Sequence, residues 1–566
     1  MKRMLFIILA GCIFLPFGGC SQKGTEPSEN LYETACKTLQ EEPLNLSENC
    51  LIDQNLIDAL YAAEYSAPKS VIFMIGDGMG FNAVTLTEYL YSETLYEGKL
   101  AMHYLPVQSA QTTYSASDDT TDSAAGGTAL ACGYKTANGV VGKTKDKKEN
   151  LRSNLELAAE KGKSTGIIST TSVTDATPAS FTAHADTRAD QENIAAQQLA
   201  KLADGTLDLA LGGGAQYYAS ENNAQALSLA TKAGLTYTGD WQQAKDAALP
   251  LAGLFAEDLL DTKNAPSLSA MTDLALTLLG QDENGFFLMI EGSQIDKGGH
   301  KNNIEYESEE LYEFDRAVSV AMRYVALHPD TLLIVTADHE TGGLRLPPAL
   351  SEETIDKVCY DTTGHSGYQV PVYAVGYQTE RLSGPLENTD LAAFVAEMLS
   401  DSTESRTEYA ALFDLSEEQT IKEIAARNSE ADQQITVLNG VLRCTFSGPD
   451  MTLLLPIEHV AEAKNRRTIY CTVKNCSDQY APLPEMLFIV KQTSVKTRTA
   501  FDYLAPGESR TVAFNVHRRH WADKFEKLTD LGLSISSSAA TSASEEQSYT
   551  LEFSNFIAGC RQNPDY

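Results

Sequence analysis

Residues 70–80 read Ser70-Val-Ile-Phe-Met-Ile-Gly-Asp-Gly-Met-Gly80, an apolar run that ends in an aspartate between two glycines. A continuous apolar run of this length is typical of a strand that is buried on both faces of a sheet. Similar runs recur at residues 164–169, 207–211, 285–290, 331–336 and 370–375, and helical patterns cover residues 151–161, 191–202, 267–279 and 309–327. Strands that alternate with helices predict an α/β fold with a largely parallel central sheet flanked by helices.

Several chemically active side chains directly follow these predicted strands. They are Asp77, Glu291, Asp338 and His339. In parallel α/β sheets, functional residues collect beyond the carboxyl ends of the strands. We therefore expect these carboxylates and this imidazole to gather at one edge of the sheet.

A serine with unusual surroundings occurs in Thr120-Thr-Asp-Ser-Ala-Ala-Gly-Gly-Thr-Ala-Leu130. A serine hydroxyl is a poor nucleophile unless a base or a metal ion activates it. The residues that follow favour a helix, so Ser123 is expected near a helix N-terminus, where backbone N–H groups attract an anion. A simple helix cap is the alternative interpretation, and it is compatible with phosphate binding. Gly126 and Gly127 cost this helix about 1 kcal/mol each relative to alanine, for which close packing is the only reason we see in the sequence.

Two further pairs have the spacing of metal ligands. Asp296 and His300 are four residues apart, so on a helical turn both side chains face one ion. Asp338 and His339 are adjacent and would point to opposite sides of a strand, but a turn at the strand end can bring them together. For Asp296 and His300 the alternative interpretation is a solvated aspartate and a histidine without a function, which are commoner in proteins in general. Against that alternative, the Gly298-Gly299 pair between them is unfavourable in an ordinary surface helix.

Six segments, taken in order, resemble the alkaline phosphatase family: residues 75–80, 120–130, 174–178, 291–300, 336–339 and 363–367. The resemblance extends from about Ser66 to Ser400. It implies hydrolysis of phosphate monoesters to an alcohol and inorganic phosphate, through a phosphoserine intermediate on Ser123. It also implies two zinc ions (Zn2+) and one magnesium ion (Mg2+), although cobalt or manganese also suits such N and O ligands.

The resemblance assigns the ligands residue by residue. Asp296, His300 and His365 correspond to the ligands of the first zinc, and Asp77, Asp338 and His339 to those of the second. The magnesium ligands correspond to Asp77, Thr177 and Glu291, with Asp175 supporting the magnesium waters. None of the ten cysteines is expected in a zinc–thiolate site.

The resemblance also assigns the residues that hold the phosphate. Arg188 is expected to fork onto two phosphate oxygens, a geometry that a lysine cannot reproduce, with Asp122 holding the guanidinium. Lys297 is expected to reach phosphate through water, and Asp175 and Lys297 together resemble the Asp/Lys pair of many bacterial members. His184 is expected to be structural.

Two other functions remain possible at this point. One is a phosphodiesterase or sulfatase-like member of the same superfamily. The other is a surface binding protein whose phosphatase-like domain is inactive. The presence of Ser123, Arg188 and all three ligand sets favours the monoester reaction over both.

Composition and the two chain ends complete these expectations. A chain of 566 residues predicts more than one domain, and a formal charge of −34 excludes binding of nucleic acid or anionic membranes through a general basic face. Residues 1–20 read as a signal peptide, which predicts an exported, cell-envelope lipoprotein with its lipid on Cys20, or alternatively on Cys12. Membrane contact is expected through that lipid alone, and the family resemblance suggests a homodimer.

We predict five regions: the signal peptide, a tether and helical segment at 21–65, a catalytic domain at 66–400, a helical connector at 401–434 and a β-sandwich-like domain at 435–566. In the last region the apolar period falls to two, and Asn439-Gly440 predicts a hairpin. Export permits disulfides, so Cys36 and Cys50 are candidates for pairing, whereas Cys132 and Cys359 are expected to be buried thiols.

Overall fold

The computed structural model describes residues 31–42, 44–48, 50–261, 263–383 and 385–399, together with the backbone of the strands between residues 435 and 559. The predicted signal peptide with Cys12 and Cys20, residues 21–30 and the predicted connector at 401–434 lie outside these ranges. Among the helices described, none has the length and apolar character needed to cross a membrane.

The centre of the fold is a ten-stranded sheet with the order β14-β2-β13-β8-β1-β7-β3-β4-β6-β5. Its strands are β1 (Ser70–Gly76), β2 (Val107–Thr112), β3 (Ser164–Ser172), β4 (Leu209–Gly213), β5 (Thr236–Thr238), β6 (Leu251–Leu254), β7 (Phe286–Gly292), β8 (Thr331–Thr336), β13 (Val370–Val375) and β14 (Pro385–Glu387). Only β13 runs antiparallel to its neighbours within this sheet, β8 and β2. The predicted largely parallel sheet is confirmed, and β2, β5, β6 and β14 are strands that the sequence analysis did not anticipate.

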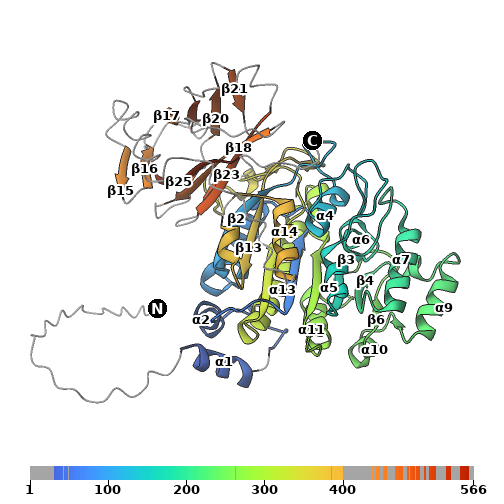
Figure 1. Ribbon diagram of the computed structural model, residues 1–566. Helices are drawn as coiled ribbons and strands as arrows, with labels where there is room; N and C mark the ends of the chain where they lie inside the picture. The colour runs from blue at the N-terminus through green and yellow to red at the C-terminus, as the bar shows by residue number, and fades with distance from the viewer. Residues whose placement is uncertain are drawn as a thin grey trace, which may run out of the picture.

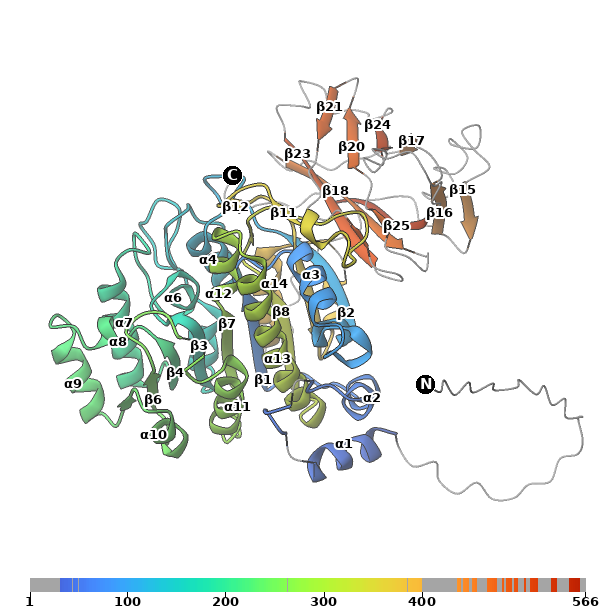
Figure 2. The same ribbon diagram turned by 180° about the vertical axis from the view of Figure 1, so that it is seen from behind.

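Helices cover both faces of this sheet (Figures 1 and 2). They are α3 (Phe81–Tyr91), α4 (Ser123–Cys132), α5 (Asn154–Glu160), α6 (Ala176–Thr182), α7 (Gln191–Asp204), α8 (Ala215–Tyr218), α9 (Ala224–Lys232), α10 (Trp241–Asp246), α11 (Leu268–Leu279), α12 (Gln294–His300), α13 (Ile304–Leu327) and α14 (Asn388–Leu399). Alternate residues of β1 enter two different cores: Ile72 packs with α11 and α13, whereas Phe73 packs with α5, α7 and α14. This burial on both faces explains the unbroken apolar runs of the sequence.

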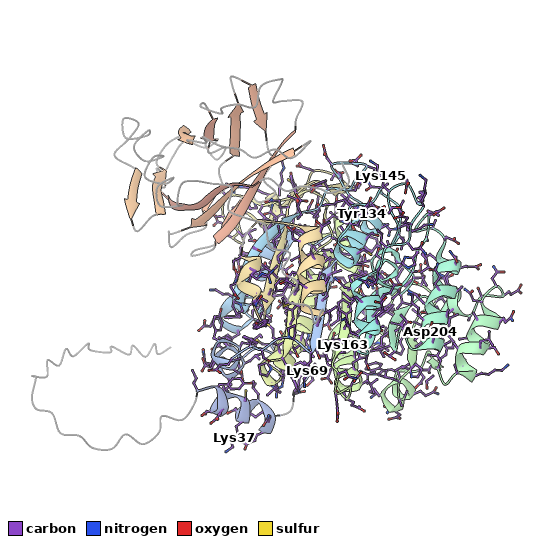
Figure 3. The ribbon with its side chains drawn as sticks, viewed as in Figure 1. Lys37, Lys69, Tyr134, Lys145, Lys163 and Asp204 are labelled. Carbon is purple, nitrogen blue, oxygen red and sulfur yellow. The ribbon has the colours of Figure 1, made fainter. Side chains whose placement is uncertain are left out.

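The amino ends of the central strands are tied together by one lysine. Lys163 donates to the backbone oxygens of Lys69 and Asn284, at 2.8 and 2.7 Å, just before β1 and β7 begin. Figure 3 shows Lys69 and Lys163 near each other, at the end of the sheet far from Tyr134 and Lys145. These contacts help to fix the register of β1, β3 and β7 along the strand direction, and hence the positions of their carboxyl ends.

The segment before the sheet forms α1 (Leu31–Glu41) and α2 (Gln54–Ala62), which gives it the helical character predicted for it. It is held to α13 by arginines. Arg316 donates to the backbone oxygens of Leu46 and Glu48, and Arg323 donates to those of Leu39 and Glu42. This segment therefore packs along the second half of α13.

The C-terminal strands form two antiparallel sheets. Their bounds are β15 (Ile435–Leu438), β16 (Val441–Phe446), β17 (Asp450–Leu455), β18 (Arg466–Asn475), β19 (Ala481–Pro482), β20 (Glu485–Val490), β21 (Thr493–Lys496), β22 (Tyr503–Leu504), β23 (Ser509–His517), β24 (Leu531–Ser536) and β25 (Tyr549–Gly559). The sheet orders are β15-β16-β25-β18-β23 and β17-β24-β20-β21, and β19 pairs with β22. Leu438 lies opposite Val441, which confirms the predicted hairpin.

The described cysteines are all free thiols: Cys36, Cys50, Cys132 and Cys359. The suggested pairing of Cys36 with Cys50 is therefore wrong in this structure, where their thiols instead contact the backbone oxygens of Ala326 and Ile52. Cys359 is exposed rather than buried, because it lies in a short strand outside the central sheet. Cys132 is a free thiol as expected, but it is half-buried rather than buried.

Candidate active site

Three neighbouring strands deliver carboxylates to the same edge of the sheet. Glu291 lies opposite Ile75 in the β1–β7 register, and Thr336 lies opposite Ile75 in the β1–β8 register. Asp77 and Asp338 each follow two residues after these paired positions, so the predicted gathering at one edge is confirmed. The Gly78 N–H, at a left-handed φ of 75°, donates to Asp338 Oδ1 at 3.2 Å.

Ser123 is the first residue of α4 and is buried. Asp122 caps the helix by accepting from the Ala125 N–H at 3.1 Å, so the helix cap that the sequence left as an alternative interpretation is present at Asp122. The Ser123 hydroxyl lies 3.1 Å from His339 Nε2. The first N–H groups of a helix lack partners within the helix, so an anion beside Ser123 would meet backbone donors.

Close packing accounts for both glycines of α4. A Cβ at Gly126 would lie 3.0 Å from the backbone oxygen of Asp338, and one at Gly127 would lie 3.0 Å from Ser180 Oγ and 3.2 Å from Thr177 Cα. The absence of side chains at these two positions therefore lets α4 approach Asp338 on one side and α6 on the other, which accounts for the glycines that the sequence showed as costly to the helix.

His339 forms the centre of a fully buried set of donor atoms. Asp77, Asp296 and His339 converge closely enough to share one cation, and we call these three the buried ligand group. His339 Nε2 lies 3.5 Å from Asp77 Oδ1 and 3.2 Å from Asp338 Oδ2. The structure thus brings Asp77, Asp338 and His339 together as expected, and it adds Asp296, which the sequence analysis had placed at the other zinc alone.

A second set is more accessible to solvent. It consists of Asp296, His300 and His365, which we call the open ligand group. Asp296 Oδ1 lies 3.3 Å from His300 Nε2 and 3.5 Å from His365 Nε2, and the two imidazole nitrogens are 3.2 Å apart. Helix α12 places Asp296 and His300 one turn apart, as their spacing predicts.

The chemistry of these groups fits metal ions. Among the described side chains, Asp77 Oδ1, Asp338 Oδ2 and Thr177 Oγ1 are buried without a hydrogen-bond partner. Burial raises the pKa of Asp338 to about 8 and that of Glu291 to about 7, and it lowers the pKa of His339 well below its ordinary value. Buried carboxylates ionise readily only beside a cation, and nitrogen and oxygen donors without thiolate suit zinc and magnesium.

Two of the three residues expected at the magnesium site, Glu291 and Thr177, come from β7 and α6, and the third, Asp77, follows β1. Glu291 Oε2 accepts from Ser169 Oγ at 2.8 Å, and Ser169 and Ser293 are hydrogen-bonded at 2.6 Å. Thr177 lies in α6 with its orphaned hydroxyl buried. Sequence analysis missed both serines, since nothing in a lone Ser169 on a strand indicates its partner on another strand.

Two cations lie on the less buried side of the site. Arg188 is 2.8 Å from Asp175 Oδ1 and 3.5 Å from Asp122 Oδ2. The structure thus pairs Arg188 with Asp122, as the resemblance implied, but more closely with Asp175, for which only a role at magnesium was expected. Lys297 Nζ is 3.3 Å from Asp296 Oδ2, and its side chain is 36% exposed.

Further residues orient the ligands and were not predicted. Thr341 donates its hydroxyl to Asp296 Oδ1 at 2.6 Å. His300 Nδ1 and His365 Nδ1 contact the backbone oxygens of Thr363 and Thr121, at 2.6 and 2.9 Å. A ligating histidine commonly uses its second ring nitrogen in this way. Backbone oxygens have no sequence signature. Of these residues only Thr341 could have been suspected from the sequence, because it lies two residues after His339.

The hydrogen-bond contacts of His184 involve neither ligand group. Its Nδ1 is 2.8 Å from the backbone oxygen of Gly142, and its Nε2 is 3.2 Å from Glu156 Oε1. These contacts agree with the structural role expected for it.

Comparison with known proteins agrees with this geometry. Residues 68–353 match the family described as alkaline phosphatase. The chain is 31% identical over 414 residues to alkaline phosphatase 3 of Bacillus subtilis, which covers 58% of this chain and 89% of that protein. The chain belongs to the alkaline phosphatase family. It is therefore a phosphatase, and the family expected from the sequence is confirmed.

The chain is also similar to a phosphatase with a different named substrate and to alkaline phosphatases of known structure. The streptomycin-6-phosphate phosphatase of Streptomyces griseus is 33% identical over 421 residues, covering 60% of this chain and 92% of that protein. The solved alkaline phosphatase of the Antarctic bacterium TAB5 is 34% identical, with a TM-score of 0.54 over 59% of this chain and 99% of that one. A mutant of the TAB5 enzyme, 33% identical with the same TM-score and coverage, has magnesium bound in its M3 site.

Proposed function

We propose that this phosphatase hydrolyses phosphate monoesters to an alcohol and inorganic phosphate through a phosphoserine on Ser123. The observation that carries the proposal is the position of the Ser123 hydroxyl, 3.1 Å from His339 Nε2 at the N-terminus of α4. That position puts a nucleophile, a set of buried ligands and helix N–H donors at one point. A phosphoryl group there would meet all three.

We further propose two zinc ions and one magnesium ion as cofactors. Asp296, His300 and His365 would hold one zinc, Asp77, Asp338 and His339 the other, and Asp77, Thr177 and Glu291 the magnesium, with Asp175 near it. Bound there, these ions would neutralise the buried carboxylates and the phosphate charge and would lower the pKa of nearby hydroxyl groups. The orphaned oxygens of Asp77, Asp338 and Thr177 support this assignment.

The protein's own residues then have distinct tasks in two displacements. In the first, Ser123 Oγ gives up its proton and bonds to phosphorus, while the ester oxygen leaves and takes up a proton to become the alcohol. In the second, a water oxygen bonds to phosphorus, and Ser123 Oγ leaves and regains a proton, which releases inorganic phosphate. Arg188 would fork onto two non-bridging oxygens, and Lys297 would contact phosphate through water.

Export and assembly are proposed on the sequence alone. The charged start, apolar core and Gly18-Gly19-Cys20 ending of residues 1–20 support export and a lipid on Cys20, and so a place in the cell envelope. The family resemblance supports a homodimer.

The test is hydrolysis of p-nitrophenyl phosphate beside bis-p-nitrophenyl phosphate at alkaline pH, with the full chain, with and without chelator. We expect monoester turnover that needs metal and that falls on the order of 10⁴-fold or more in Ser123→Ala, as when other enzymes lose their nucleophile. Preference for the diester would indicate a phosphodiesterase instead. Failure of metal-loaded protein to hydrolyse either ester would favour the binding function.

A further inference from the structure

The open ligand group depends on a segment with little regular structure. Residues 359–366 supply His365 and the Thr363 oxygen that holds His300. The segment contains only the two-residue strands β11 (Cys359–Tyr360) and β12 (His365–Ser366), which pair with the equally short β10 (Leu344–Arg345) and β9 (Glu340–Thr341). None of these four belongs to the ten-stranded sheet. The two imidazoles therefore need support from outside the segment.

Tyr360 provides a contact that leaves the segment. Its hydroxyl donates to Glu307 Oε2 at 2.6 Å. Glu307 lies in the first turn of α13 and is only 2% exposed. At 2.6 Å this bond lies at the short end of the range for O–H···O hydrogen bonds, so it ties the segment to α13.

Glu307 also contacts the helix that carries the other two ligands. A Cβ at Gly298 would lie 2.5 Å from Glu307 Cα, so the backbones of α12 and α13 touch there. Gly298 stands midway between Asp296 and His300, and its backbone oxygen accepts from the Asn303 N–H at 3.0 Å. One residue thus braces α12 with its backbone and residues 359–366 with its carboxylate.

The Tyr360 ring fixes the segment on its other side. A Cβ at Gly342 would lie 2.6 Å from Tyr360 Cδ1, so the ring lies directly against that glycine. The Gly342 N–H donates to the Gly364 oxygen at 2.9 Å, and its own oxygen accepts from the Thr362 N–H at 3.0 Å. Movement of Tyr360 would therefore displace the residues immediately before His365.

We propose that the Glu307–Tyr360 hydrogen bond is a clamp that positions His300 and His365 for metal binding by the open ligand group. Neither residue is among the proposed ligands or phosphate-binding groups, so both act through the imidazoles as positioning residues. The inference rests on the proposed function in one respect, which is that it takes Asp296, His300 and His365 as a zinc site.

The test compares zinc retention in two tyrosine variants of the full chain. Tyr360→Phe keeps the ring against Gly342 and removes only the hydroxyl. Tyr104→Phe is the matched control, since it removes a hydroxyl that donates at 2.7 Å to the Tyr96 oxygen, elsewhere in the protein. Zinc release is followed with a chromophoric chelator, and bound zinc is counted after dialysis. We expect one zinc ion to be released from Tyr360→Phe about 10-fold faster than from the wild type. This factor is the lower end of the range for residues that support metal ligands.

A third variant separates the hydrogen bond from general loosening. Glu307→Gln keeps an oxygen that accepts the Tyr360 hydroxyl, so its zinc retention is expected to stay close to that of the wild type. Excess zinc should also restore turnover in Tyr360→Phe. Wild-type zinc retention in Tyr360→Phe, or equal zinc loss in Tyr104→Phe, would overturn the clamp. Because zinc release is measured without substrate, a zinc-binding protein that hydrolyses no phosphate ester would refute the proposed function alone.

Discussion

The two ligand groups share Asp296 and are otherwise built in opposite ways. The buried ligand group takes Asp77 and His339 from just beyond the ends of β1 and β8, adjacent strands at the centre of the sheet. The open ligand group takes His300 from a seven-residue helix and His365 from a two-residue strand, and the His300 side chain is 37% exposed. The sheet thus fixes one group, whereas local hydrogen bonds fix the other.

Removing one histidine from each group is the strongest test of this difference. His339→Ala should lower kcat/KM by more than about 100-fold, above the range for residues that only support ligands, and excess zinc should not restore it. His300→Ala should cost about 10- to 100-fold and recover in part with zinc, because water can occupy an exposed ligand position. Steady-state kinetics across a zinc titration would show both. Equal losses with equal recovery would mean that burial does not distinguish the groups.

The buried carboxylates should also make the stability of metal-free protein depend on pH. Burial raises the pKa of Asp338 to about 8 and of Glu291 to about 7, whereas in the unfolded chain both ionise near their ordinary values of about 4. Between these limits the folded state binds more protons than the unfolded state, so stability falls as pH rises from about 4 to about 8. Bound metal favours the ionised carboxylates and should flatten the slope.

Thermal unfolding of chelator-treated and metal-loaded protein, from pH 5 to pH 8, would measure this effect. A metal-free midpoint that rises with pH would contradict the prediction. An identical slope in the metal-loaded protein would show that these carboxylates do not face the metal.

A smaller effect is expected from one added methyl group near each ligand group. In Gly126→Ala the new Cβ would lie 3.0 Å from the Asp338 oxygen, so Asp338 must shift by a few tenths of an ångström. Alanine in turn favours the helix by about 1 kcal/mol, so the stability should change little while kcat falls several-fold. Gly364→Ala is the control, because its Cβ would meet only Thr362 Oγ1 at 3.6 Å. Comparable kcat values in the two variants would show that α4 has room to yield.

The sequence predicts the parts of this site that depend on local pattern. Apolar runs located β1, β7 and β8 and so placed Asp77, Glu291 and Asp338 at one edge. Helical spacing joined Asp296 to His300. The preference for Asp175 over Asp122 at Arg188 was not predictable, because it depends on how α6 lies beside α4. The same holds for Glu307 and Tyr360, which are 53 residues apart and fit no catalytic motif.

Other expectations failed or succeeded according to whether they depend on local or on distant parts of the chain. Cys359 was expected to be buried from its place in the catalytic stretch, but it lies on a short outer strand. Gly126 looked costly in the sequence, and only the approach of Asp338 shows what its missing side chain allows. Asn439-Gly440 predicted its hairpin correctly, because turn chemistry and register are both local.

Helix α13 connects the candidate active site to the amino-terminal helix α1. Glu307 near its first turn bonds to Tyr360, and near its last turn the Ala326 oxygen accepts from the Tyr32 hydroxyl of α1. At 1.5 Å per residue, these two points are about 29 Å apart on a single rigid rod, and Figure 1 shows α1 at the opposite end of the sheet from α4. A molecule attached to a bead or another surface through α1 would present its catalytic face away from that surface.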